Sequence, residues 1–192
     1  EKADNFYPFD AAKAGEMLDT AGWVMGADGI RARNGESLTL KTIGFAVFRA
    51  LYEASQSNLR QIGVNLDLQI IDTAAAVEAN HRGDHHWAMT GVVASDPSNI
   101  ALLYHSRNYN GYDWSRVQDP AFDKMWDDAA SELDREKRLK MYEDIQLYIM
   151  ENALSVPMQA IVRNNFYAAD IKGIKPDARG IYIWLYDSYI EG

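Results

Sequence analysis

The chain has 192 residues, a length that fits one domain or one domain with an appendage, and its 47% hydrophobic and 24% charged residues are ordinary for a globular protein. Its formal net charge of −9 comes without a basic stripe, so we expect no nucleic-acid partner. No cysteine is present, which excludes disulfide and thiolate chemistry.

The N-terminal part of the chain predicts a helix followed by a small ribbon. Asp10 is placed to cap the helix at its start, and Gly22 is placed to end it. The turn dipeptides Asp28-Gly29 and Asn34-Gly35 then predict a hairpin or ribbon over residues 24–37.

A strand, helix, strand series follows the ribbon. Alternating apolar residues predict strands at 38–43 and 64–71, and apolar residues at helical spacing predict a helix at 47–62 between them. Such a unit favours parallel strands. After a short helix at 74–80, the apolar run at 87–94 predicts a third, central strand of the same sheet.

The C-terminal half predicts two amphipathic helices in tandem. Asp119 followed by Pro120 is typical of a helix start, and Asp134 is placed to cap the second helix. We expect helices 119–133 and 134–153 to pack on the sheet. The remaining elements are a short helix at 98–105, short strands at 158–162 and 171–174, and a buried aromatic strand at 181–186.

Several motifs, taken in order, resemble a known family. They are Tyr7-Pro8-Phe9-Asp10, Ala21-Gly22-Trp23, Phe122-Asp123 and the Asn152-Ala153 step before Val156-Pro157. Together they resemble the extracellular solute-binding proteins of family 5, the peptide- and nickel-binding class that serves ABC importers. The resemblance covers nearly the whole chain.

The resemblance implies an α/β fold, the C-terminal lobe of a type II (cluster C-like) periplasmic solute-binding protein with a mixed sheet flanked by helices. Residues 1–162 would form this lobe, and residues 163–192 would be a tail that returns to the N-terminal lobe. Because the chain opens at Glu1 without an initiator Met or a signal peptide, we expect a piece of a longer precursor.

The function implied by the resemblance is that of the substrate-binding component of an ABC importer. It would capture a peptide-like or other small solute and deliver it to a membrane permease, in the periplasm or as a cell-surface lipoprotein of a Gram-positive organism. The alternative is a protein-interaction or sensor module with the same fold and no transported solute. Neither a nucleophile motif nor a phosphate-binding loop is present, so we expect neither an enzyme nor a cofactor.

Asp96 is the leading candidate for a ligand contact. It lies with Ser95 just past the predicted strand at 87–94, and open α/β sheets bind ligands at the carboxyl ends of their strands. Asp96 before Pro97 is equally typical of a helix cap. By the resemblance, this Asp-Pro element would supply a carboxylate to an amino group of the ligand. Family members commonly carry a Trp and a second acid shortly before it, where this chain has Gly91, Val92 and Val93, so peptide specificity does not follow.

Tyr112 and Trp114 follow the Asn110-Gly111 turn, and either of them could be core or could line an apolar pocket. The candidate ligand-binding residues are therefore Asp96, Ser95, Val93, Tyr112, Trp114 and Asn110. His81, Asp84, His85 and His86 form a metal-like cluster, but Gly83 breaks the helical spacing that a zinc site would use, so we expect no metal.

The tail predicts a further property of the chain by itself. If residues after about Val162 return to the other lobe, the apolar segment from Ile181 to Ile190 lacks its partner strands. It would then be disordered, fold back on this domain, or pair with a second copy, because an exposed apolar edge recruits strands.

Overall fold

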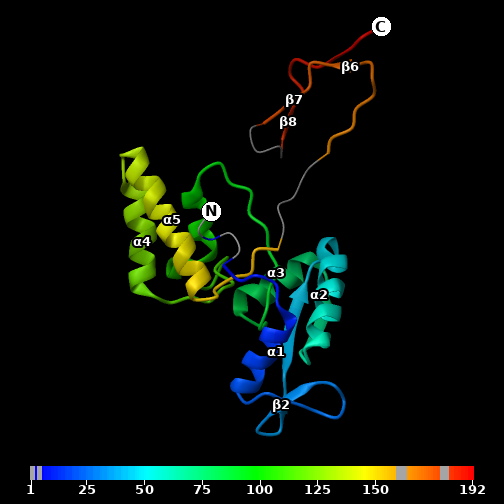
Figure 1. Cartoon of the computed structure of the whole chain (residues 1–192). Coiled ribbons are helices and arrows are strands. Elements are labelled where there is room, and N and C mark those ends of the chain that lie inside the picture. Colours follow the sequence, from blue (N-terminus) through cyan, green and yellow to red (C-terminus); the bar gives the residue numbers. More distant parts are fainter. Residues whose placement is uncertain (1–2, 4–5, 159–163, 178–181) are drawn as a thin grey trace.

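The computed structural model describes residue 3 and residues 6–158, 164–177 and 182–192 (Figure 1). The α-helices are α1 (Ala11–Thr20), α2 (Arg49–Gln61), α3 (Thr73–Arg82), α4 (Pro120–Ser131) and α5 (Arg135–Glu151). The 3-10 helices are η1 (Ala46–Phe48), η2 (Pro97–Leu103) and η3 (Ser106–Asn108). The strands are β1 (Val24–Met25), β2 (Arg31–Arg33), β3 (Glu36–Ser37), β4 (Thr39–Gly44), β5 (Asn65–Ile70), β6 (Ile171–Lys172), β7 (Lys175–Pro176), β8 (Ile183–Trp184) and β9 (Tyr189–Ile190).

The chain is of the α/β class, as expected. Parallel and antiparallel pairs nevertheless lie in separate sheets of the described part of the chain, where a single mixed sheet was expected. None of the helices in these described ranges is long and apolar enough to cross a membrane.

The predicted helix and ribbon at the N-terminus are confirmed. Asp10 caps α1 by accepting the Lys13 N–H at 2.9 Å, and β1, β2 and β3 form a three-stranded antiparallel ribbon. Arg31 in β2 is buried, and it donates to the carbonyls of Trp23 and Ile62 at 2.7 and 2.8 Å. It also pairs with Asp19 of α1, so one guanidinium joins α1, the ribbon and the end of α2.

The predicted parallel pair is also confirmed, with α2 between its strands. β4 and β5 are in register over six residues, from Thr39 opposite Asn65 to Gly44 opposite Ile70. Tyr52 of α2 is fully buried against this pair. A Cβ on Gly44 would lie 2.5 Å from the Tyr52 ring, so only glycine leaves room for the tyrosine there.

The predicted third strand at 87–94 is wrong. The Lys41 N–H of β4 donates to the imidazole Nδ1 of His86 at 3.1 Å, and the Lys41 carbonyl accepts from the backbone N–H groups of His86 and Trp87. Further along, the Met89 N–H donates to the Tyr52 hydroxyl at 3.2 Å. The side chains of His86 and Tyr52 thus accept hydrogen bonds from backbone N–H groups that would pair with backbone carbonyls in a sheet. The apolar run at 87–94 therefore continues without regular strand pairing.

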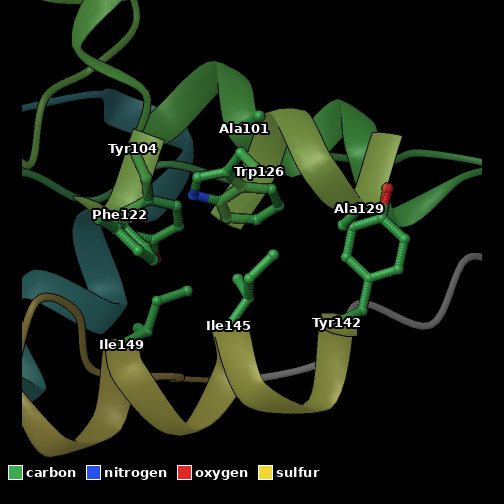
Figure 2. Packing of buried hydrophobic residues seen from close by; sticks show 8 residues of the cluster. All are labelled: Ala101, Tyr104, Phe122, Trp126, Ala129, Tyr142, Ile145 and Ile149. Atoms are coloured by element: carbon green, nitrogen blue, oxygen red, sulfur yellow. The ribbon is translucent and has the colours of Figure 1, made fainter. Parts of the chain in front are cut away.

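The two tandem helices are confirmed, but their packing differs from the prediction. α4 and α5 enclose a core with η2, and Figure 2 shows the α5 side chains Tyr142, Ile145 and Ile149 facing those of α4 and η2. This core consists of Ala101, Tyr104, Phe122, Trp126, Ala129, Tyr142, Ile145 and Ile149. Within the described ranges it includes no residue of β4 or β5, because the short 3-10 segment already covers the apolar faces of both helices. The short helix expected at 98–105 is present as the 3-10 helix η2.

The tail forms one bent antiparallel hairpin, which Figure 1 shows standing apart from the helices. β6 pairs with β9 and β7 with β8, and the register shifts by two residues between the two pairs. The expected buried aromatic strand is wrong where it can be assessed, since Trp184 is 62% exposed and Tyr186 is 98% exposed. Ile181 and most of the expected strand at 158–162 lie outside the described residues.

Replacing Gly44 with alanine tests the packing of Tyr52. The added Cβ would meet ring carbons of Tyr52 at 2.5 and 2.8 Å, so we expect Gly44→Ala to lower the free energy of unfolding by about 1–3 kcal/mol in urea titration. Gly91→Ala is the matched control, because nothing lies within 4 Å of a Cβ there, and it should change stability by less than about 0.5 kcal/mol. Equal effects of the two substitutions would contradict this account.

Candidate functional site

Asp96 caps η2. Its side chain accepts the Ser98 backbone N–H at 2.9 Å, and Pro97 follows as the first residue of the helix. The hydroxyl and backbone N–H of Ser98 hold the pKa of Asp96 below its usual range, and the nearby Arg138 guanidinium acts in the same direction. The cap interpretation of Asp96 is thus observed directly, and a ligand contact would use the remaining face of the carboxylate.

Ser95 and Val93 lie on the irregular segment before this cap. Both are exposed, Val93 by 44%. Because residues 87–94 form no strand, Asp96 does not follow the carboxyl end of one, and the sheet-edge reason for placing a ligand beside it no longer applies.

Four rings gather at the carboxyl end of β4 instead. Phe45 directly follows β4 and stacks on Trp114 with ring centroids 5.9 Å apart, and Trp114 stacks in turn on Tyr112 at 6.3 Å. His81 of α3 meets Tyr112 edge-on at 5.1 Å. We call Phe45, Trp114, Tyr112 and His81 the aromatic stack. Trp114 is only 8% exposed whereas Tyr112 is 48% exposed, so the tyrosine forms the solvent-facing end.

Buried polar atoms without a hydrogen-bond partner surround the aromatic stack. Within the described residues they include Nε1 of Trp114, Nε2 of His81, Nδ1 of His85 and Oδ2 of Asp113. Buried polar groups are normally paired, so such a concentration is typical of a site whose partner is a ligand or a bound water. The stack therefore offers apolar ring surface with hydrogen-bonding atoms next to it.

The two titratable neighbours of Trp114 have shifted pKa values. Burial lowers the pKa of His85, although its Nε2 lies 3.0 Å from the Trp114 carbonyl, which favours the charged form. Burial raises the pKa of Asp113, which is opposed by hydrogen bonds from the Ser115 hydroxyl and the Arg116 N–H. Both shifts follow from the exclusion of water beneath the stack.

Arg116 fixes the loop that holds Tyr112 and Trp114. Its guanidinium lies 3.9 Å from the centroid of the Tyr109 ring and donates to the His81 carbonyl at 3.1 Å. A Cβ on Gly83 would lie 2.8 Å from this guanidinium, so the glycine leaves space for it. Arg116 itself has a φ of +59°, a left-handed conformation that is unfavourable for residues other than glycine.

The six predicted site residues fall into two groups. Tyr112 and Trp114 contact each other, with the exposed Asn110 in the same loop, whereas Asp96, Ser95 and Val93 lie on another segment. No ring contact or hydrogen bond joins the two groups in the part of the chain that is described. The sequence prediction missed Phe45, His81 and His85. The position of Phe45 directly after a half-buried strand was the signal that could have found it.

The histidine cluster is dispersed in the folded chain. His86 binds the edge of β4, His85 lies at the Trp114 carbonyl, and Asp84 pairs with Arg82. Among the described residues, no group of three or more His, Asp or Glu side chains is arranged to hold a metal ion. A shallow open depression elsewhere, on α1, is lined by Lys13, Glu16, Met17, Thr20 and Ala21. It offers no aromatic ring, so we place the candidate site at the aromatic stack.

The family model for bacterial extracellular solute-binding proteins, family 5 Middle, matches residues 1–114, which is more than half of the chain. The chain belongs to this family. The match includes the aromatic stack and all six residues predicted as ligand contacts. Members of this family are binding proteins, and the family is extracellular.

Relatives of this solute-binding protein are much longer than the present chain. The oligopeptide-binding protein AppA of Bacillus subtilis is 29% identical over 155 residues, covering 76% of this chain and 28% of AppA. The dipeptide-binding protein of Pseudomonas aeruginosa is 26% identical over 175 residues, covering 87% of this chain and 31% of that protein. The chain therefore spans less than a third of these two relatives.

Solved structures show the same fold. AppA in complex with a nonapeptide aligns with a TM-score of 0.66 at 26% identity, covering 76% of this chain and 30% of AppA. NikA from Brucella suis in complex with Fe(III)-EDTA aligns with a TM-score of 0.68 at 24% identity, covering 77% of this chain and 31% of NikA. The second likeness is one of fold alone.

The lowered pKa of His85 predicts a pH-dependent stability. The folded state binds fewer protons at His85 than the unfolded state does, so this contribution is complete above the ordinary histidine pKa of about 6.5 and is lost as the pH falls below it. His85→Gln places a side-chain N–H near the position of Nε2, within reach of the Trp114 carbonyl, but does not titrate. We expect the variant to lose less stability than the parent chain between about pH 7.5 and pH 5.

Denaturant unfolding at both pH values measures this difference. Subtracting the variant from the parent removes the contributions of the other three histidines, which both proteins share. Identical pH dependence of the two proteins would contradict the lowered pKa of His85.

Proposed function

We propose that this chain is one lobe of the substrate-binding component of an ABC importer. The complete protein would close two lobes on a solute and deliver it to a membrane permease, and hinged closure of this kind is known for periplasmic binding proteins. Family membership supports this role. The observation that supports a solute site in this chain is the aromatic stack. It lies at the carboxyl end of β4, where α/β sheets bind ligands.

The solute we propose is peptide-like. AppA binds a nonapeptide, whereas NikA holds Fe(III)-EDTA, so the fold alone does not select the solute. The half-exposed Tyr112 ring could cover an apolar side chain, and the buried N–H of Trp114 could donate to a carbonyl once closure excludes water. The role is capture and not conversion, since these groups bind and orient a solute without a nucleophile.

The organisation we propose follows the division made from the sequence. Residues 1–162 form the lobe, and residues 163–192 return to the other lobe, whose surface would cover the exposed aromatic rings of the tail. The protein would act in the periplasm or as a cell-surface lipoprotein, because the family is extracellular. We propose a membrane permease as its partner on the same ground, the membership of the chain in this family.

A thermal-shift screen of the full-length protein tests the function. Peptides of two to nine residues, metal chelates and sugars are compared, and we expect peptides to raise the melting temperature, since ligands that bind only the folded state stabilise it. A shift with no solute class would favour the rival role of a protein-interaction or sensor module.

Two substitutions separate the possible roles of Asp96. Asn is a good helix cap without charge, whereas Ala removes both properties. If Asp96 binds an amino group of the solute, Asp96→Asn in the full-length protein should weaken peptide binding by roughly tenfold with an unchanged melting temperature. Asp96→Ala should weaken binding and lower the melting temperature as well, because η2 loses its cap.

Calorimetry and thermal melts give both readouts for each variant. Unchanged affinity in Asp96→Asn, with a lower melting temperature only in Asp96→Ala, would restrict Asp96 to the cap. A peptide blocked at its amino terminus is the control ligand, because its affinity should not respond to the loss of the charge.

The tail predicts self-association of this chain in isolation. A lone two-stranded hairpin is marginally stable in water, and this one exposes Tyr182, Trp184, Tyr186 and Ile190. We expect light scattering of the 192-residue chain to show dimers at high concentration. Trp184→Lys should abolish them, whereas Phe9→Lys, at a position 94% exposed elsewhere, should not. A monomeric parent chain at all concentrations would exclude pairing through the tail.

A further inference from the structure

The segment before the first helix contacts the last turn of α5, from which the chain leaves the described helices. The incoming segment is residues 6–10, which lead to the cap of α1, and the outgoing segment is residues 152–158, which follow α5. The Tyr7 hydroxyl donates to the Met150 carbonyl at 2.9 Å, across 143 positions of sequence. Figure 1 shows the N-terminal segment beside the end of α5 from which the outgoing chain departs.

The incoming segment bends at Phe6 and Tyr7 before it runs on to α1. Pro8 disfavours a helical backbone at Tyr7, and the rings of Phe6 and Tyr7 pack edge-on at 5.0 Å. Three residues beyond Tyr7, Asp10 caps α1. The Tyr7 hydroxyl therefore joins the start of the first helix to the end of the last one.

The outgoing segment begins with a strained residue. Ala153 has a φ of +50°, in the left-handed region that glycine normally occupies at a helix end. The Leu154 N–H donates to the Ile149 carbonyl and the Ala153 N–H to the Met150 carbonyl, which is the Schellman pattern. The carbonyl of Met150 thus accepts from both Tyr7 and Ala153, so the strained turn and the incoming segment share one acceptor.

A second contact fixes the outgoing segment just beyond this turn. The Tyr104 hydroxyl donates to Ser155 Oγ at 2.7 Å, and Leu154 packs against the core of α4 and α5. Strained backbone persists only where its surroundings over-determine it, and here hydrogen bonds and packing hold the direction in which the chain leaves α5.

We propose that Tyr7 and the strained turn at Ala153 form a latch that fixes the separation of the incoming and outgoing segments. The inference rests on the proposed two-lobe function for its consequence, because both segments would then lead to the other lobe. With the latch closed, the two connections pivot as one unit when the lobes close on a solute. Without it, each connection bends by itself and the lobes can twist.

The test measures the separation directly. The chain contains no cysteine, so Phe9→Cys and Val156→Cys, at positions 94% and 71% exposed, can be spin-labelled selectively. Dipolar EPR then gives the distance distribution between the incoming and outgoing segments, by the pulsed method or by continuous-wave broadening if the labels are close. We expect a narrow distribution in the labelled parent chain and a broader one when Tyr7→Phe is added.

Tyr186→Phe is the matched control. It removes one hydroxyl from a side chain that is 98% exposed in the tail, and it should leave the distribution unchanged. An unaltered width in Tyr7→Phe, or equal broadening in the control, would overturn the latch, and so would a lower melting temperature of Tyr7→Phe at constant width. The readout requires no solute, so failure of the transport role would leave it intact.

Discussion

The packing of Tyr52 against Gly44 is the constraint on which the sheet half of the molecule depends. The fully buried ring occupies the space that a Cβ at position 44 of β4 would need, and its hydroxyl accepts a hydrogen bond from the Met89 N–H. Its edge also meets Trp87, with ring centroids 5.8 Å apart. One side chain of α2 therefore sets the distance of its helix from β4 and the path of the segment that runs along the strand. Burial is the main cause that raises the pKa of Tyr52, so the hydroxyl keeps its proton.

The same packing explains how far the sequence predicted the fold. Helical periodicity and caps at Asp10, Asp119 and Asp134 locate their helices because these signals are local. The apolar run at 87–94 has the composition of a central strand, yet the His86 imidazole occupies the Lys41 N–H that such a strand would need. A side chain that replaces a backbone acceptor depends on tertiary geometry, and no sequence period reports it.

The candidate site was predictable only in part for a related reason. Tyr112 and Trp114 are equivalent in sequence terms, but one is half exposed and the other is buried. The difference comes from Phe45 and His81, which arrive from β4 and α3. Phe45 also packs on the small core of Ile43, Ala76 and Ala79, so the stack is an extension of the sheet core. Asp96 gave two equal interpretations, and its cap is visible only because Ser98 is seen to donate to it.

The loop that holds the site also joins the two cores of the domain. At its start, the Ser106 N–H donates to Asp123 of α4 at 2.9 Å, and His105 lies between Asp123 and Asp127 at 3.2 and 3.3 Å. At its end, Arg116 donates to the last turn of α3. The loop is thus anchored to the helical core on one side and to the sheet core on the other. We expect a shift of one core against the other to move Tyr112 and Trp114, because hydrogen bonds hold both ends of their loop. The position of the aromatic stack is therefore a consequence of how the two cores are joined. Substitutions at residues that contact no ring of the stack, such as Asp123 in α4, act on the site through this loop.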